Sequence, residues 1–342
     1  MRSMKFMTNF GIILFAGIMM GCTGAPLPQS QPQPASQSGK KKIPEITFKN
    51  LSPPYEAYDY FQGSKGYVFR FNATTFSLIN AWWLAESSTL VYADEDFVKP
   101  RFSEAKLREV HFLDSQSTQC YVANNDKFAI VAFRGSEIWK KREKIDLNAM
   151  FADLKTNIDI RLTDWEKGGK VHRGFKEALD QVWPDLLPYI ENLHHKGCKI
   201  WMTGHSLGAA LATLAASRFG NVQGVYTFGS PRVGDEVFRE RLKIRIYRIV
   251  NNDDIVPRVP PSGAYVHVGE LKFIDSHGII QNAMNGNEPL IKESRDETYG
   301  QGDSGQPKKK LFNGFVPDAF RDHVPLLYAI HLWNNIIESR QY

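Results

Sequence analysis

Short, continuous apolar runs recur along this chain and alternate with longer runs that are apolar on one face only. The short runs are rich in β-branched and aromatic residues, which is typical of buried strands. The predicted strands are residues 119–124, 128–133, 199–203, 222–228, 244–250 and 265–273. Asn124, Asn125 and Asp126 lie where the first two strands meet, so we predict a hairpin there.

Apolar residues at helical spacing mark the remaining elements. The predicted helices are residues 75–92, 103–110, 175–193, 209–216 and 324–339. We expect the third helix to be interrupted near Pro184 and Pro188, because proline removes a helical hydrogen bond. Strands that alternate with helices predict an α/β fold, in which a mostly parallel central sheet carries helices on both faces.

The segment Gly204-His205-Ser206-Leu207-Gly208 lies between a predicted strand and a predicted helix. Its glycines allow a sharp turn that keeps Ser206 exposed at the edge of the sheet. The backbone N–H groups at the start of the helix favour negative charge that develops there. A G-x-S-x-G motif also occurs in ordinary strand–helix turns, but with these flanks it predicts a nucleophilic serine.

A serine hydroxyl becomes a nucleophile only when a histidine takes its proton and an acid orients that histidine. In α/β-hydrolases the acid follows the serine in the chain and the histidine comes last. Asp254 comes just after the predicted strand 244–250, and Pro257 prevents that strand from continuing. We therefore predict Asp254 as the acid, with Asp253 as the nearest alternative.

Four histidines follow this acid in the chain: His267, His277, His323 and His331. His267 lies in a predicted strand and His331 in the final predicted helix, where packing explains them. His323 directly precedes that helix, in a loop that could reach the serine. We predict His323 as the base, and His277, beside a glycine-containing loop, stays an alternative.

Several blocks resemble, in the same order, the class 3 lipases, the fungal-type triacylglycerol lipase family of α/β-hydrolases. These blocks are Val131–Ser136, Lys170–Phe175, Thr203–Ala210, Tyr226–Asp235, Val250–Pro261 and Asp322–Tyr328. The resemblance implies a carboxylic-ester hydrolase that attacks lipid esters through Ser206, with Asp254 and His323 completing a triad. It also implies an oxyanion hole made by the backbone N–H of Leu207 and by the N–H and hydroxyl of Ser136. It implies no cofactor.

Two stretches depart from the pattern of this family. Residues 137–144 stand before the block 148–154, which resembles the part of the family that closes the lid. They are basic and include Trp139, so they suit a lipid surface, although a solvated charged loop explains them equally well. A second insertion, at about residues 282–310, is polar and predicts a surface loop.

The start of the chain resembles a bacterial lipoprotein signal. Arg2 and Lys5 precede an apolar stretch at residues 11–20, and Gly21 and Cys22 follow it. Residues 1–21 are then a signal peptide and Cys22 is the lipidated residue. An ordinary cleaved signal or an uncleaved anchor is the alternative.

Residues 22–42 are rich in Pro, Gln and Ser and hold too little apolar surface to fold. We expect a disordered tether there and one catalytic domain over residues 43–342. The lipoprotein resemblance implies a membrane surface as partner and a place in the bacterial cell envelope. The residues after Cys22 include no aspartate of the kind that retains lipoproteins at the inner membrane, which favours the outer membrane in a Gram-negative source.

Composition narrows the classes of function. The formal net charge of +5 comes without an aromatic-interleaved basic stripe, so no nucleic-acid partner is expected. The histidines lack paired metal-ligand spacing, so no metal is expected either. Cys120 and Cys198 lie in or beside predicted core strands and are expected as free thiols, with a disulfide as the alternative. Two further functions stay open: an esterase or acyltransferase for smaller acyl donors, and a non-catalytic surface lipoprotein.

Overall fold

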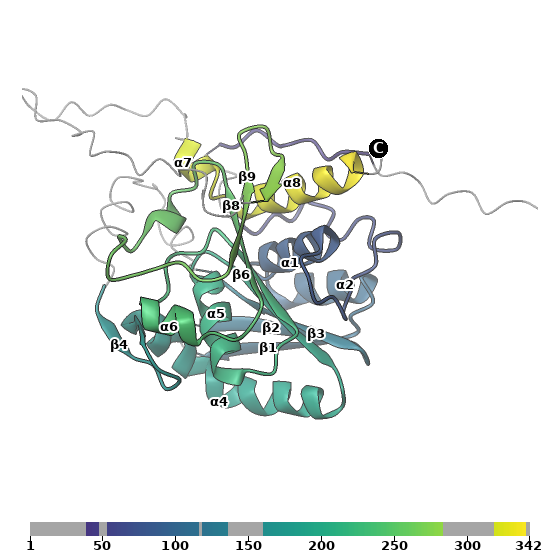
Figure 1. Ribbon diagram of the computed structural model, residues 1–342. Coiled ribbons are helices and arrows are strands. Elements are labelled where there is room, and N and C mark those ends of the chain that lie inside the picture. The colour runs from purple at the N-terminus through teal and green to yellow at the C-terminus, as the bar shows by residue number, and fades with distance from the viewer. Residues whose placement is uncertain (1–38, 48–52, 116–117, 136–159, 283–317, 340–342) are drawn as a thin grey trace, which may run out of the picture. The chain divides into compact units, whose positions relative to one another are not determined.

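The computed structural model describes residues 39–47, 53–115, 118–135, 160–282 and 318–339. Its centre is an eight-stranded sheet in the order β1-β2-β3-β6-β7-β8-β9-β10 (Figure 1). The strands are β1 (Glu109–Ser115), β2 (Thr118–Asn124), β3 (Phe128–Phe133), β6 (Lys199–His205), β7 (Gly224–Phe228), β8 (Ile246–Asn251), β9 (Glu270–Ile274) and β10 (Ile280–Asn282). A separate two-stranded sheet pairs β4 (Leu162–Asp164) with β5 (Lys170–His172).

The middle of the large sheet is parallel, as the alternation of strands and helices predicts. Strands β3, β6, β7, β8 and β9 run parallel, whereas β1, β2 and β10 pair antiparallel at the two edges. Phe133 of β3 pairs with Gly204 of β6, which in turn pairs with Thr227 of β7. The carboxyl ends of these strands therefore lie at one edge of the sheet, where ligands bind in open α/β sheets.

Helices cover both faces of the sheet. On one face α1 (Leu78–Leu90) packs against α8 (Pro325–Glu338), and their aromatic side chains Trp82 and Trp333 meet at 4.9 Å between ring centroids. On the other face α4 (Arg173–His195) and α5 (Leu207–Phe219) pack against each other and bury a second apolar core. The other helices of the described residues are α2 (Glu95–Glu104), α6 (Glu236–Arg241), α7 (Asp318–Arg321) and the 3-10 turn η2 (Val256–Arg258).

The prediction of a helix over residues 103–110 is wrong. The helix in this region, α2, ends at Glu104, and residues 109–115 form β1. Exposure alternates along the start of β1, and each of its residues pairs with one of β2. Cross-strand pairing with the predicted hairpin therefore decides the structure here, because one short amphipathic run suits either element.

The predicted interruption of the third helix is also wrong, because α4 is one continuous helix of 23 residues. Pro184 and Pro188 both lie on its exposed side, while Leu186 and Ile190 face the core. The carbonyl groups that lose a helical partner to proline therefore face the solvent side, where water can satisfy them.

The last predicted strand begins later than expected, at Glu270 instead of residue 265. Gly269 adopts a φ of +85°, and a Cβ atom there would lie 2.7 Å from the Ile246 carbonyl oxygen. Residue 269 therefore breaks the extended run, and His267 precedes the strand. The other predicted strands and helices are present with ends shifted by a few residues.

The structure describes residues 39–42, which the sequence predicts as the end of the tether. The main chain of Lys41 exchanges two hydrogen bonds with the Asn334 side chain of α8. The Lys41 ammonium lies 3.5 Å from the buried Glu86 carboxylate of α1 and 3.9 Å from the centre of the Tyr58 ring. The last residues of the predicted tether thus join α1 to α8.

We expect Lys41→Ala to lower the free energy of unfolding by about 3 kcal/mol, because it leaves the Glu86 carboxylate buried without its cation. Lys40→Ala is the matched control, since Lys40 pairs with the exposed Glu338 and such pairs contribute about 1 kcal/mol at most. Urea-induced unfolding of the two variants measures the difference. Equal losses would show that the Lys41–Glu86 pair does not stabilise the fold.

Candidate active site

Ser206 occupies the sharp turn between β6 and α5. Its φ of +59° and ψ of −127° are strained values for a residue with a side chain. Its amide donates to the Phe228 carbonyl at 3.0 Å, which ties the turn to the end of β7. Such a turn raises the serine hydroxyl above the edge of the sheet.

Two glycines make this turn possible. A Cβ atom on Gly204 would lie 2.2 Å from the Gly208 carbonyl oxygen. One on Gly208 would lie 2.3 Å from the Phe133 carbonyl oxygen at the end of β3. The backbones of β3, β6 and α5 therefore approach too closely for side chains at these two positions.

Asp254 and His323 form a buried pair. Asp254 follows β8 and His323 lies between α7 and α8, and His323 Nδ1 donates to Asp254 Oδ2 at 2.9 Å. The Val256 amide donates to the other carboxylate oxygen at 2.9 Å, which holds the carboxylate plane. Because Nδ1 carries the hydrogen in this bond, Nε2 is the nitrogen of His323 that can accept a proton.

Gly229 brings this pair next to the serine turn. It directly follows Phe228, whose carbonyl accepts from the Ser206 amide. A Cβ atom on Gly229 would lie 2.6 Å from Asp254 Oδ2 and 3.0 Å from His323 Nδ1. Asp254 and His323 therefore pack against the backbone of Gly229, next to the residue that bonds to the Ser206 amide. This arrangement brings all three predicted residues to one edge of the sheet.

Tyr328 of α8 is a third donor to the acid. Its hydroxyl donates to Asp254 Oδ2 at 2.5 Å and accepts from the Asn251 amide at 3.1 Å. Burial and the Asp254 charge raise the pKa of Tyr328 well above its usual range, so the hydroxyl stays a neutral donor. Sequence analysis placed Tyr328 only within a family block, and its contact with Asp254 depends on the docking of α8.

The alternative residues lie elsewhere. Asp253 is exposed and pairs with Arg258 at 3.1 Å. His267 donates to the Pro257 carbonyl at 2.8 Å, and the His331 ring lies against Gly278. His277 lies in the turn after β9, where its amide donates to the Asp275 side chain.

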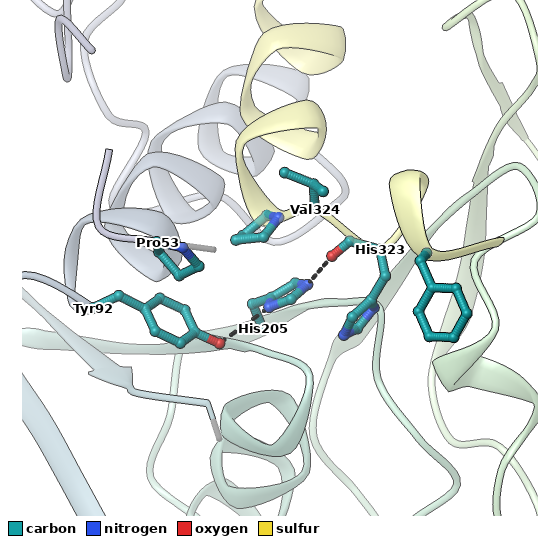
Figure 2. A pocket seen from close by; sticks show the side chains of 7 residues that line it. Pro53, Tyr92, His205, His323 and Val324 are labelled. Carbon is teal, nitrogen blue, oxygen red and sulfur yellow. Dashed lines mark hydrogen bonds between the residues drawn. The ribbon is translucent and has the colours of Figure 1, made fainter. Parts of the chain in front are cut away.

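A second histidine touches the base, and sequence analysis missed it. His205 fills the variable position of the serine motif, and its ring lies 4.4 Å from the His323 ring, measured between centroids. Figure 2 shows the His205 ring between the Tyr92 hydroxyl and the His323 main-chain carbonyl. These side chains line a recess together with Pro53, Phe320, Val324 and Pro325. The motif marks the position of His205, but only the fold shows what the ring contacts.

The described part of the predicted oxyanion hole is Leu207, the first residue of α5. Its amide belongs to the first turn, whose N–H groups have no partner within the helix. A Cβ atom on Gly135 would lie 2.7 Å from the His205 carbonyl oxygen, so the chain that leads to residue 136 packs against the serine turn. Ser136, Cys22 and the stretches 137–144 and 148–154 lie outside the described residues.

Neither a metal cluster nor a membrane span is found in the described ranges. No three His, Cys, Asp or Glu side chains of the described residues are grouped so that they could hold a metal ion. None of the described helices combines the length and the apolar character that crossing a bilayer requires. Cys120 and Cys198 are buried free thiols.

We expect the free energy of unfolding to fall as the pH drops below about 6.5, the usual pKa of histidine. Burial holds the pKa of both His205 and His267 well below that value, helped by the neighbouring His323 for His205 and by the Arg248 and Arg232 charges for His267, so each takes up a proton only on unfolding. Each contributes a slope of up to about 1.4 kcal/mol per pH unit between its folded and unfolded pKa values.

His267→Gln isolates one of these protons, since glutamine can still donate to the Pro257 carbonyl but does not titrate in this range. Urea unfolding between pH 7 and 5 should show a shallower loss of stability in this variant than in the parent protein. Parallel curves for the two proteins would contradict a lowered pKa of His267.

Comparisons with known proteins find similarity to lipases over part of the chain. Residues 130–264 match the model of a family described as Lipase (class 3). The chain is 33% identical over 177 residues to a lipase of Rhizopus niveus, and this alignment covers 46% of this chain and 42% of that protein. It is 36% identical over 121 residues to Phospholipase A1-II 6 of Oryza sativa subsp. japonica, and this alignment covers 29% of each protein.

Among solved structures, the native Rhizomucor miehei lipase propeptide complex aligns with a TM-score of 0.46 and 26% identity. This alignment covers 58% of this chain and 68% of that one. The chain spans less than half the length of the two curated relatives described above.

Proposed function

We propose that this protein is a serine carboxylic-ester hydrolase that acts on lipid esters. One support is that residues 130–264 match the model of the class 3 lipase family. The observation that carries the proposal is the buried Asp254–His323 hydrogen bond of 2.9 Å beside the strained turn of Ser206. Without an orienting acid, a histidine would not be held in the tautomer that accepts a serine proton.

In the proposed reaction, Ser206 Oγ attacks the ester carbonyl while His323 Nε2 takes its proton. Asp254 stabilises the imidazolium, and the N–H groups of Leu207 and Ser136, with the Ser136 hydroxyl, hold the negative oxygen. The imidazolium then protonates the leaving alcohol, which leaves the acyl group on Ser206. Water, deprotonated by His323, attacks that acyl group, releases the fatty acid and restores the serine.

The proposed substrates are acylglycerols or phospholipids cleaved in the manner of a triacylglycerol lipase or a phospholipase A1. The support is that relatives carrying both kinds of name match this chain. Mass identification of the products from triacylglycerol emulsions and phosphatidylcholine vesicles tests this proposal. Activity confined to acetyl and butyryl esters would instead indicate an esterase or acyltransferase for small acyl donors.

We expect Ser206→Ala to abolish hydrolysis and Asp254→Asn to lower kcat by about 10⁴-fold, because the asparagine favours the wrong histidine tautomer. Asp253→Asn is the matched control, since the Asp253 carboxylate is next to Asp254 in the chain but is exposed and pairs with Arg258. The kcat of this variant should stay within about twofold of the parent. Full activity in Ser206→Ala would overturn the proposed nucleophile, and equal losses in the two aspartate variants would overturn the proposed acid.

We also propose that Cys22 is lipidated and that residues after it tether the enzyme to a membrane of the bacterial cell envelope. The support is the order of charge, apolar stretch and cysteine at residues 2–22. One lipid chain binds membranes only weakly, so additional chains or basic residues would be needed for stable attachment. Lys42 at the end of the tether is exposed and carries such charge.

Cells expressing the full chain with an alkyne fatty acid should incorporate the label and keep the protein in the membrane fraction. Cys22→Ser should lose the label, whereas Cys198→Ser, which changes a cysteine of the folded domain, should keep it. Label retained by Cys22→Ser would contradict lipidation at this residue.

A further inference from the structure

Both ring nitrogens of His205 are engaged in hydrogen bonds. Nε2 lies 2.8 Å from the main-chain carbonyl oxygen of His323, and Nδ1 lies 3.2 Å from the Tyr92 hydroxyl. A carbonyl oxygen only accepts, so Nε2 carries the hydrogen. Nδ1 of the neutral ring then accepts from Tyr92, and the two partners together select one tautomer.

Tyr92 is itself held from both sides. It follows α1 in the chain, between Val91 and Ala93, and the carbonyls of these two neighbours accept from the Arg134 guanidinium at 2.6 and 2.8 Å. Arg134 comes directly after β3. The main chain on both sides of Tyr92 is thus tied to the main sheet through Arg134.

His323 is held at two points. Its Nδ1 bonds to Asp254, and its carbonyl accepts from His205 on the adjacent serine turn. Only Asp322, His323 and Val324 separate α7 from α8. The His323 amide donates to the Phe320 carbonyl at 3.2 Å and the Asn251 side chain donates to the Asp322 carbonyl at 3.0 Å, but neither bond reaches the serine turn. The carbonyl bond therefore ties the loop of the base directly to the residue that precedes the nucleophile.

We propose that His205, in the tautomer selected by Tyr92, is a positioning residue that holds the main chain of His323 so that its imidazole stays between Asp254 and Ser206. This inference rests on the proposed function. It adds to the triad a second hydrogen-bonded chain, from Tyr92 through His205 to the base, which acts on the backbone of His323 instead of its ring.

The charge of His205 suits this role. In the proposed reaction His323 becomes a cation with the His205 ring 4.4 Å away. A protonated His205 would repel that cation and would lose the acceptor for Tyr92. Burial and the neighbouring His323 keep the pKa of His205 well below its usual value, so the ring stays neutral. The rings of Tyr92 and Tyr328 also face His205. Burial and the Asp254 charge raise the pKa of Tyr328 well above its usual range, so its hydroxyl stays neutral.

Three variants test the inference in the full chain with the nitrophenyl ester that the parent protein hydrolyses best. His205→Leu replaces the ring with an apolar side chain of similar size that has no hydrogen-bond donor. We expect kcat to fall about 100-fold and KM to stay within about twofold, because a small misplacement of the base is costly. His205→Gln places an N–H group near the position of Nε2 and should recover at least about tenfold of that loss. Tyr92→Phe should lower kcat by about three- to tenfold.

The matched control is Tyr226→Phe, which removes a buried hydroxyl that accepts from the Ser77 amide on the face of α1. Its stability should fall as in Tyr92→Phe, but its kcat should match that of the parent. Unchanged kcat in Tyr92→Phe, equal kcat in His205→Gln and His205→Leu, or a loss that appears only in KM would each overturn the positioning role. An inactive parent protein would instead overturn the proposed function, so the two failures are distinguishable.

Discussion

The close backbone approach between the carboxyl ends of β3 and β6 and the start of α5 is the constraint on which the candidate site depends. Gly204 and Gly208 leave no room for side chains there, and Ser206 takes up the strained turn that results. Gly229, just after β7, plays the same role: because it has no side chain, the Asp254–His323 pair can pack against its backbone. Cβ atoms at these three glycine positions would clash with the neighbouring backbone or with the Asp254–His323 pair, and would therefore separate the nucleophile from the acid and the base.

The residues that join this edge of the sheet come from distant parts of the chain. Helix α8 supplies Tyr328 to the acid and begins next to the loop of the base, and α1 leads into Tyr92. These two helices pack through Trp82 and Trp333, and Lys41 bridges them at the far side through Glu86 and Asn334. The geometry of the site is therefore tied to the packing of one helical layer, which extends to the end of the predicted tether.

Most of the fold could be predicted because its signals are local, and the residues proposed as nucleophile, acid and base were predicted from signals of the same kind. A strand, a glycine-bounded serine and a helix adjoin in sequence, and Asp254 and His323 lie directly after or before strongly patterned elements. The errors arose where the deciding contact is remote. Residues 109–115 were predicted partly as helix because their pairing with β2 is invisible in a short window, and α4 was predicted broken because solvent exposure of its prolines depends on which face meets the core.

By itself, the sequence predicted the α/β class, the serine turn and the residues proposed as acid and base, since periodicity, glycine spacing and chain order are properties of the sequence. Only the tertiary structure decided what surrounds them. His205 occupies a motif position open to any residue, Tyr92 lies outside the blocks that resemble the family, and Tyr328 ends one of those blocks without a predicted role. Their roles come from hydrogen bonds across 113, 118 and 74 residues of chain, which depend on how helices dock on the sheet. Docking is set by the sum of many side-chain contacts, and no short sequence pattern records that sum.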